Sequence, residues 1–115
     1  MMVDWSKVSI FVRPGPTDMR KQINGLAVIV QETLGADPMS GNLYLFSNRR
    51  HTHLKILYWD QTGFAMWLKR LEKQRFPWPQ GEDQVKQIGV EQLRMLLSGI
   101  DFWHAHQKLE FSSVT

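Results

Sequence analysis

The residues of this sequence best suited to chemistry are the cations and tryptophans between Arg49 and Trp78. This segment holds seven lysines and arginines against two acidic residues, whereas the rest of the chain holds seven against nine. Cationic side chains bind phosphate and indole rings stack on bases, so the segment predicts a surface for nucleic acid or for an acidic partner. The residues concerned are the cations Arg49, Arg50, Lys55, Lys69, Arg70, Lys73 and Arg75 and the rings Trp59, Trp67 and Trp78.

Arg20 and Lys21 form a second, smaller cationic group just after Thr17 and Asp18. The apolar spacing that follows predicts a helix, and a helix N-terminus flanked by two cations could hold a phosphate. Cations in a first helical turn are unfavourable for the helix dipole, however. The simpler interpretation is therefore two solvated side chains or an Asp18–Arg20 ion pair.

Residue types that often catalyse reactions or bind metals form no recognisable site. The pairs His51/His53 and His104/His106 have a spacing that places two imidazoles on one face of a strand, as a transition metal requires. One pair falls in an expected turn and the other in an unassigned tail, so we expect solvated histidines. Carboxylates such as Asp60 are dispersed, and no nucleophile motif or phosphate-cradling glycine loop occurs. We predict that the protein is not an enzyme and uses no cofactor or metal.

The composition predicts one soluble domain over residues 1–115. The chain is 43% hydrophobic and 22% charged, which is ordinary for a globular protein with one modest core. No apolar run is long enough to span a membrane, and no signal peptide is recognisable. The absence of cysteine excludes disulfides and fits a reducing compartment, so a cytoplasmic location is expected.

The elements that must position these residues follow the order β-α-β-β-β-(β)-α. Strands are expected over Val8–Arg13, Leu43–Ser47, Leu54–Trp59, Phe64–Arg70 and, more briefly, Gln84–Ile88. A first helix is predicted from an N-cap at Thr17 to Gly35, and a second over Val90–Ser98, with the tail from Phe102 unassigned. Short turns between strands favour hairpins. We therefore predict an α+β fold, with a single antiparallel sheet of four to five strands and two packed helices.

The sequence D-Q-T-G between the two longest expected strands predicts a hairpin turn. With a three-residue bulged loop, Asp60 lies opposite Phe64, and Lys55 lies opposite Lys69 on the same face as Trp67. Two opposed lysines repel each other unless an anion lies between them, so this face could bind phosphate. The simpler interpretation is that helices cover both faces and the tryptophans are core, since tryptophan is more often packed than used for binding. A two-residue loop would shift the parity and mix the faces.

Short motifs follow one another in a recognisable order along most of the chain. They are T-D-M-R-K from Thr17, G-L from Gly25, L-Y-L-F from Leu43, N-R-R from Asn48, K-I-L-Y-W-D from Lys55, K-R-L-E from Lys69, R-F from Arg75, W-P from Trp78 and G-I-D from Gly99. Through them the sequence, from about Phe11 to Asp101, resembles the TnpB-type accessory proteins encoded by the second reading frame of insertion sequences of the IS-sixty-six group. The RNA-guided nuclease that shares the TnpB label has acidic motifs that are absent here.

The resemblance implies a small protein that assists transposition beside a transposase encoded by a separate frame, and it carries over no catalytic site. The chain departs from the family pattern at Asn24, where an acid is usual, and in its tail, which lacks the basic ending often seen. Our main hypothesis is a non-enzymatic factor that binds DNA through phosphates.

Two other hypotheses remain open. The first is a protein-interaction module whose basic aromatic face docks on the transposase or on another copy of itself, because tryptophan and arginine are favoured interface anchors. The second is a cryptic metal-dependent nuclease that uses Asp60.

Overall fold

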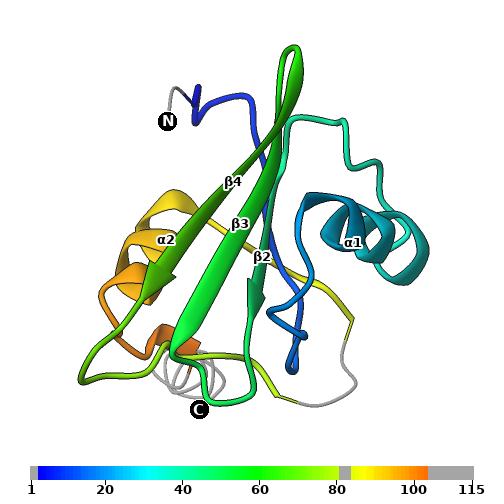
Figure 1. The fold of residues 1–115 in the computed structure, drawn as a ribbon. Helices are drawn as coiled ribbons and strands as arrows, with labels where there is room; N and C mark the ends of the chain where they lie inside the picture. Colours follow the sequence, from blue (N-terminus) through cyan, green and yellow to red (C-terminus); the bar gives the residue numbers. More distant parts are fainter. Residues whose placement is uncertain (1–2, 81–83, 104–115) are drawn as a thin grey trace.

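The strands of the chain form one sheet, and a helix packs on each of its faces (Figure 1). The computed structural model describes residues 3–80 and 84–103. The strands are β1 (Ile10–Val12), β2 (Leu43–Ser47), β3 (His53–Asp60), β4 (Gly63–Arg70) and β5 (Lys86–Ile88). The helices are α1 (Ile23–Val28), which continues as the π-helical turn η1 (Ile29–Thr33), and α2 (Val90–Leu97). None of these helices is long and apolar enough to cross a membrane.

The five strands lie in the order β4-β3-β2-β1-β5. This confirms the α+β class, the two helices and the single sheet, but the sheet is mixed. β1 pairs parallel with β2, Ile10 opposite Leu43, whereas the other neighbours are antiparallel. The expectation of a wholly antiparallel sheet was therefore wrong. A hairpin turn sets the relative direction only of the two strands that it joins. The chain passes from β1 to β2 through α1, and such a crossover connects parallel strands.

The central strand β2 is buried on both of its faces. Leu43 and Leu45 pack in the cluster that includes α2, and Tyr44 and Phe46 pack in the cluster that includes α1. This division follows from the alternation of side chains along a strand. The structure thus confirms the simpler interpretation that helices cover both faces of the sheet.

The first helix begins later than the sequence predicts. Thr17 is not its N-cap: the Thr17 amide donates to the carbonyl of Ser47 at 2.7 Å, and the Thr17 hydroxyl accepts a hydrogen bond from Arg13 at 2.8 Å. The chain therefore stays tied to the end of β2, and the helix starts at Ile23. The predicted end is confirmed, because Gly35 follows the helix with a φ of 63°.

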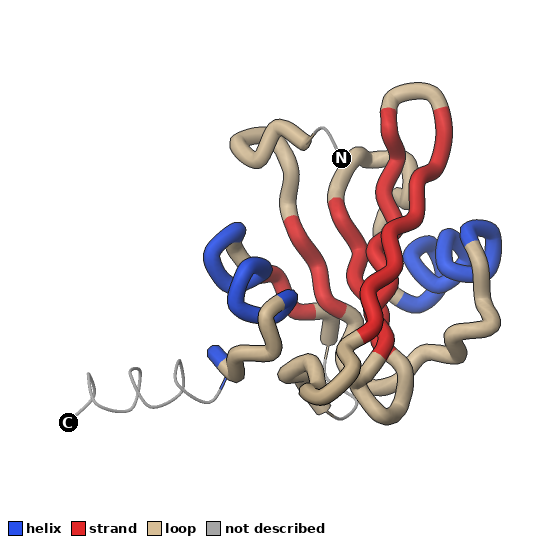
Figure 2. The backbone as a smooth tube through the Cα atoms, turned by 60° about the vertical axis from the view of Figure 1, so that its left-hand side comes forward, coloured by secondary structure: helices blue, strands red, loops and turns tan. Residues whose placement is uncertain are grey.

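The β3–β4 hairpin turns through two residues, not through the bulged three-residue loop that we expected. Asp60 pairs with Gly63 across the loop residues Gln61 and Thr62. Gln61 has a φ of 56°, the left-handed backbone that two-residue hairpins need at their first position. The tip of this hairpin extends beyond the other strands (Figure 2).

The shorter loop reverses the predicted faces of the hairpin. Lys55 pairs with Leu68, and Leu54 pairs with Lys69, so the two lysines lie on opposite faces of the sheet. A shift of one residue moves every side chain of a strand to the other face. The predicted opposition of Lys55 and Lys69 was therefore wrong, and no lysine pair is available there to hold an anion between them.

Candidate nucleic-acid interface

Two basic segments lie side by side at the end of the sheet where β2 and β4 finish (Figure 1). The Leu71 amide donates to the carbonyl of Thr52 at 2.9 Å, and the Phe76 amide donates to the carbonyl of His51 at 2.7 Å. These bonds join the β2–β3 turn to the segment that follows β4. The "basic end" is the set of cations on these two segments and at the end of β4, namely Arg49, Arg50, Arg70, Lys73 and Arg75.

Asn48 builds the turn that presents the first two cations. Its side-chain oxygen accepts hydrogen bonds from the amides of Thr52, at 2.9 Å, and His53, at 3.1 Å. Its side-chain nitrogen donates to the hydroxyl of Thr52 at 3.0 Å. One amide side chain thereby binds both sides of the turn, and Arg49 and Arg50 are exposed at its tip.

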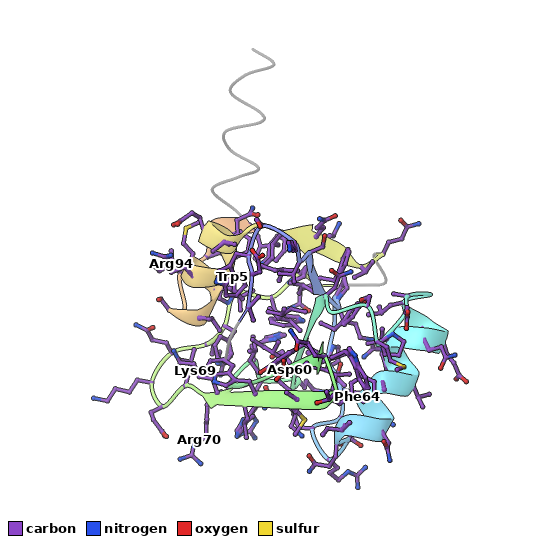
Figure 3. All side chains as sticks on the ribbon, turned by 90° about the horizontal axis from the view of Figure 1, so that it is seen from above. Trp5, Asp60, Phe64, Lys69, Arg70 and Arg94 are labelled. Carbon is purple, nitrogen blue, oxygen red and sulfur yellow. The ribbon has the colours of Figure 1, made fainter. Side chains whose placement is uncertain are left out.

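The cations of the basic end are largely free of internal partners. Arg49, Arg50, Lys73 and Arg75 are exposed, and none of them forms an ion pair with any residue of the described chain. Arg70 lies 2.8 Å from Glu72, but both side chains are well exposed, and such surface pairs contribute little stability. The side chain of Arg70 points away from the body of the molecule (Figure 3).

The side chain of Trp78, close in sequence to Lys73 and Arg75, is fixed within the core. Its indole nitrogen donates to the carbonyl of Arg13 at 2.8 Å, and the residue is only 6% exposed. Phe76, two residues earlier, is buried in the same core. Trp78 was predicted as a stacking or interface residue, but its ring is packed within the fold and is not accessible to a base.

His51 packs on Trp78 beneath the exposed cations. Its ring stacks on the indole with centroids 6.5 Å apart, and its backbone has a positive φ of 60°. Nδ1 of His51 is buried and has no hydrogen-bond partner among the residues that the structure describes. Burial, and then the charge of Arg75, lower the pKa of His51 below its usual value. Both effects disfavour the protonated imidazole.

The histidines form no metal site in the part of the chain that the structure describes, where no three histidines or carboxylates converge. His53 points its Nδ1 toward Thr52 and Asn48, at 3.0 and 3.3 Å. The pair His104/His106 lies outside the described residues. The absence of a metal and of a cofactor stays a prediction.

Lys55 and Lys69, both predicted to contact phosphate, are engaged within the fold. Lys55 is 4% exposed and donates to the carbonyls of Met19, at 2.9 Å, and Lys21, at 2.8 Å. Burial lowers the pKa of Lys55. Lys69 donates to the carbonyl of Leu97 at the end of α2, at 2.9 Å, where cations suit the helix dipole.

The second cationic group lies beside the basic end. Nη2 of Arg20 lies 2.8 Å from the Asp18 carboxylate, which confirms the simpler interpretation of an ion pair. Hydrogen bonds from Arg20 lower the pKa of Asp18 to about 2. A cleft of about 340 Å³ is lined by Asp18, the ion-pair partner of Arg20, and by Asn48 and Arg49. Arg20 and Lys21 are both exposed.

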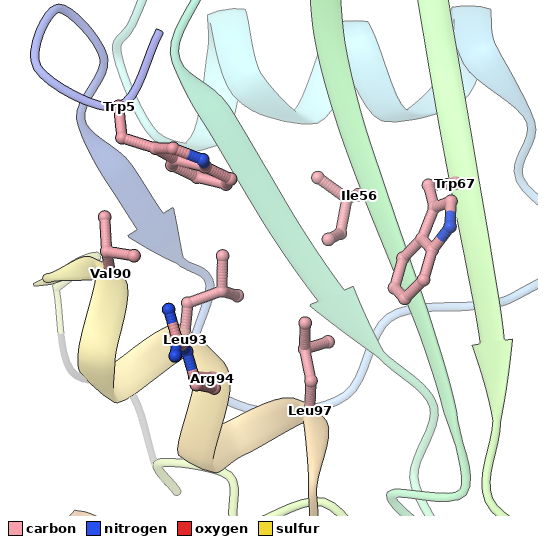
Figure 4. Close-up of a pocket in the computed structure, with 7 residues that line it drawn as sticks. All are labelled: Trp5, Ile56, Trp67, Val90, Leu93, Arg94 and Leu97. Atoms are coloured by element: carbon pink, nitrogen blue, oxygen red, sulfur yellow. The ribbon is translucent and has the colours of Figure 1, made fainter. Parts of the chain in front are cut away.

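The hairpin tryptophans lie on opposite faces of the sheet and form no single aromatic surface. Trp59 packs edge-on against Phe64, with ring centroids 5.0 Å apart. Trp67 lines an apolar cavity of about 260 Å³ between the hairpin and α2 (Figure 4). Trp5, which is 40% exposed, lines the same cavity. Sequence reasoning missed Trp5, because nothing local to it indicates that the N-terminal turn packs near α2.

The sequence of this chain is similar to a known family and to individual proteins. Residues 8–107 match the family model described as IS66 Orf2 like protein. The chain is 38% identical over 107 residues to uncharacterized protein y4hO of Sinorhizobium fredii, a match that covers 93% of each chain. It is 32% identical over 99 residues to uncharacterized protein y4jC of the same organism, covering 86% of this chain and 85% of the relative. No solved structure matches.

Proposed function

This chain belongs to the IS66 Orf2-like family, whose role is associated with transposition, and from that premise we propose that it binds DNA at the basic end as a non-enzymatic accessory factor. The transposase encoded by a separate frame would then supply the strand-transfer chemistry. In this proposal the basic end holds the DNA by its phosphates.

The observation that carries the proposal is a group of four exposed cations on two segments that are hydrogen-bonded to each other. Within the described residues none of the four has an ion-pair partner; they are Arg49, Arg50, Lys73 and Arg75. Cations that already have carboxylate partners would lose those partners on binding phosphate. These four lose none within the described chain, and each phosphate that they neutralise releases condensed counterions, which favours binding.

The same geometry supports phosphate contact over base recognition. Trp78 is packed beneath the surface, and Trp59 and Trp67 lie along the hairpin on opposite faces. Phosphate contacts position a protein on DNA but carry no sequence information directly. We therefore expect binding with little sequence preference.

The proposal is tested by titrating duplex DNA at several salt concentrations. Four phosphate contacts predict that log affinity falls with log salt at a slope of about −3.6. Replacing Arg49 and Arg50 together by glutamine should weaken binding and reduce the slope by about 2. Lys7→Gln is the control, because Lys7 is exposed and belongs to the N-terminal segment, which lies at the other end of the sheet (Figure 1). Absence of binding at low salt, or equal losses in the control, would overturn the proposal.

A second candidate function is docking on the transposase. The apolar cavity lined by Trp5 and Trp67 favours it, because an open apolar cavity with two indoles suits an anchoring side chain of a protein partner. Co-purification with the transposase in high salt without DNA, lost in Trp5→Ala, would support this function. Retention of the partner by Trp5→Ala would count against it.

A further inference from the structure

The two edges of the sheet differ sharply in length. β5 ends the sheet on one side with three residues, whereas β4 ends it on the other side with eight. An edge strand presents unpaired N–H and C=O groups, and proteins usually protect such edges by keeping them short or by adding proline. β4 reads G-F-A-M-W-L-K-R, without proline, and β3 is its only strand partner in the described chain.

Apolar side chains remain accessible along this long edge. Leu68 is 53% exposed, and Phe64, Met66 and Trp67 are only partly buried. All five residues of the central strand β2, by contrast, are buried. The helices pack against the two faces of the sheet and leave the outer edge of β4 uncovered (Figure 1).

We propose that β4 pairs antiparallel with β4 of a second copy of this chain, joining two sheets into one of ten strands. Antiparallel pairing of identical strands has two-fold symmetry and closes on itself. A two-fold axis perpendicular to the sheet keeps each face on its own side, so residues pair only with residues of the same face. Centring the axis on Met66 brings Phe64 opposite Leu68 of the second copy, and Ala65 opposite Trp67.

Side-chain size favours this register. The exposed Leu68 covers the partly buried ring of Phe64 in the other copy, and this contact occurs twice. Ala65 leaves room for the indole of Trp67 beside it. Cross-strand pairs of aromatic and aliphatic side chains stabilise sheets, and small residues opposite large ones let the two edges approach.

Charge also favours antiparallel pairing. Asp60 is exposed at the hairpin tip and pairs with Gly63, which has no side chain. In the proposed register Lys69 of the second copy lies across from Gly63, on the same face as Asp60. Lys69 keeps its hydrogen bond to the carbonyl of Leu97 in its own copy, so the favourable contribution is the nearness of opposite charges on one face and not a direct ion pair. Parallel pairing would instead bring the Lys69–Arg70 ends of the two strands together.

The basic ends of the two copies then lie at opposite ends of the paired strands, each beside the hairpin tip of the other copy. Pairing through β4 needs neither DNA nor any residue of the turn at Arg49 and Arg50. The pairing and the proposed DNA contact therefore fail independently of each other.

The test is the mass of the full chain in DNA-free buffer, measured by sedimentation velocity over a range of concentrations. We expect twice the chain mass of 13.5 kDa. Leu68→Lys should raise the dimer dissociation constant at least tenfold. Met39→Lys is the matched control, because Met39 is 52% exposed and belongs to the loop between η1 and β2, not to β4. A monomer at all concentrations, or equal association of the two variants, overturns the proposal.

A mixing experiment separates pairing from a loss of folding. Met66→Lys and Met66→Glu each place like charges opposite one another at the two-fold axis, so each should be monomeric, with folding checked by circular dichroism. An equimolar mixture should form a dimer, because unlike charges then meet. If both variants are folded and the mixture stays monomeric while wild type dimerises, the pairing lies elsewhere and the proposal is wrong. If either variant unfolds, Leu68→Lys against Met39→Lys decides.

Discussion

The ammonium of Lys55 lies 2.9 Å from the carbonyl oxygen of Met19, a residue 36 positions earlier in the chain. A second bond, of 2.8 Å to the carbonyl of Lys21, completes the contact. Lys55 thereby ties the middle of the hairpin to the segment that leads into α1. The sequence predicted that Lys55 contacts DNA, but in the structure its ammonium joins two parts of the fold.

Replacing Lys55 by methionine, which keeps the length of the side chain, should destabilise the fold. Hydrogen bonds to charged groups contribute roughly 1.5–3 kcal/mol each, and their loss leaves two carbonyls without this donor, so we expect the free energy of unfolding to fall by about 2 kcal/mol or more. Urea denaturation measures this. Lys73→Met, at an exposed position, should change stability by less than about 0.5 kcal/mol. Equal effects of the two changes would show that the hydrogen bonds of Lys55 contribute nothing to the free energy of unfolding.

Asp18 should stabilise the fold at neutral pH but not in strong acid. Its pKa is lowered from 3.8 to about 2 by hydrogen bonds from Arg20, so the folded state favours the charged form. The contribution is present above the unfolded value and is lost as the pH falls through about 2. Melting temperatures of wild type and Asp18→Asn should therefore differ at pH 7 and converge near pH 2. Glu32→Gln, an exposed control, should follow wild type; a difference that persists in strong acid would contradict this origin.

His51 should make stability fall as the medium becomes mildly acidic. Burial and the charge of Arg75 lower its pKa below 6.5, so the unfolded chain takes up a proton more readily than the folded one. Stability should therefore decrease as the pH falls through 6.5 toward the folded value. His51→Asn, which tolerates the positive φ, should flatten this dependence in denaturation curves, whereas His53→Gln should leave it in place. An unchanged slope in His51→Asn would refute the assignment.

Part of the fold could be predicted because its signals are local. The apolar spacing from Met19 to Leu34 predicted a helix that ends at Gly35, and α1 and η1 occupy the part of it from Ile23 to Thr33; α2 begins at Val90 as predicted. The motif order predicted the family, and the family match confirms it. The predicted surface is only partly recovered: Arg49, Arg50, Lys73 and Arg75 are exposed together, and their contact with DNA stays a prediction.

The rest depended on contacts between distant segments. Thr17 has the side chain of a helix cap, yet its amide binds Ser47 across the sheet. Trp78 has the composition of a binding residue, yet its indole finds the carbonyl of Arg13. The neighbouring sequence does not show whether such a side chain will bond to a carbonyl within the fold or remain free to bind a ligand.

The sequence by itself determined the element types, the local excess of positive charge and the membership of a family, because side-chain periodicity and composition act over a few residues. Tertiary structure decided the parallel pairing of β1 with β2 and which side chains lie on each face of the hairpin. It also decided which cations bond within the fold and which remain exposed. The physical reason is the two-residue repeat of a strand. One residue fewer in the loop at Gln61 turns Lys55 toward α1 and Lys69 toward α2, and leaves the exposed arginines and Lys73 to carry the surface charge.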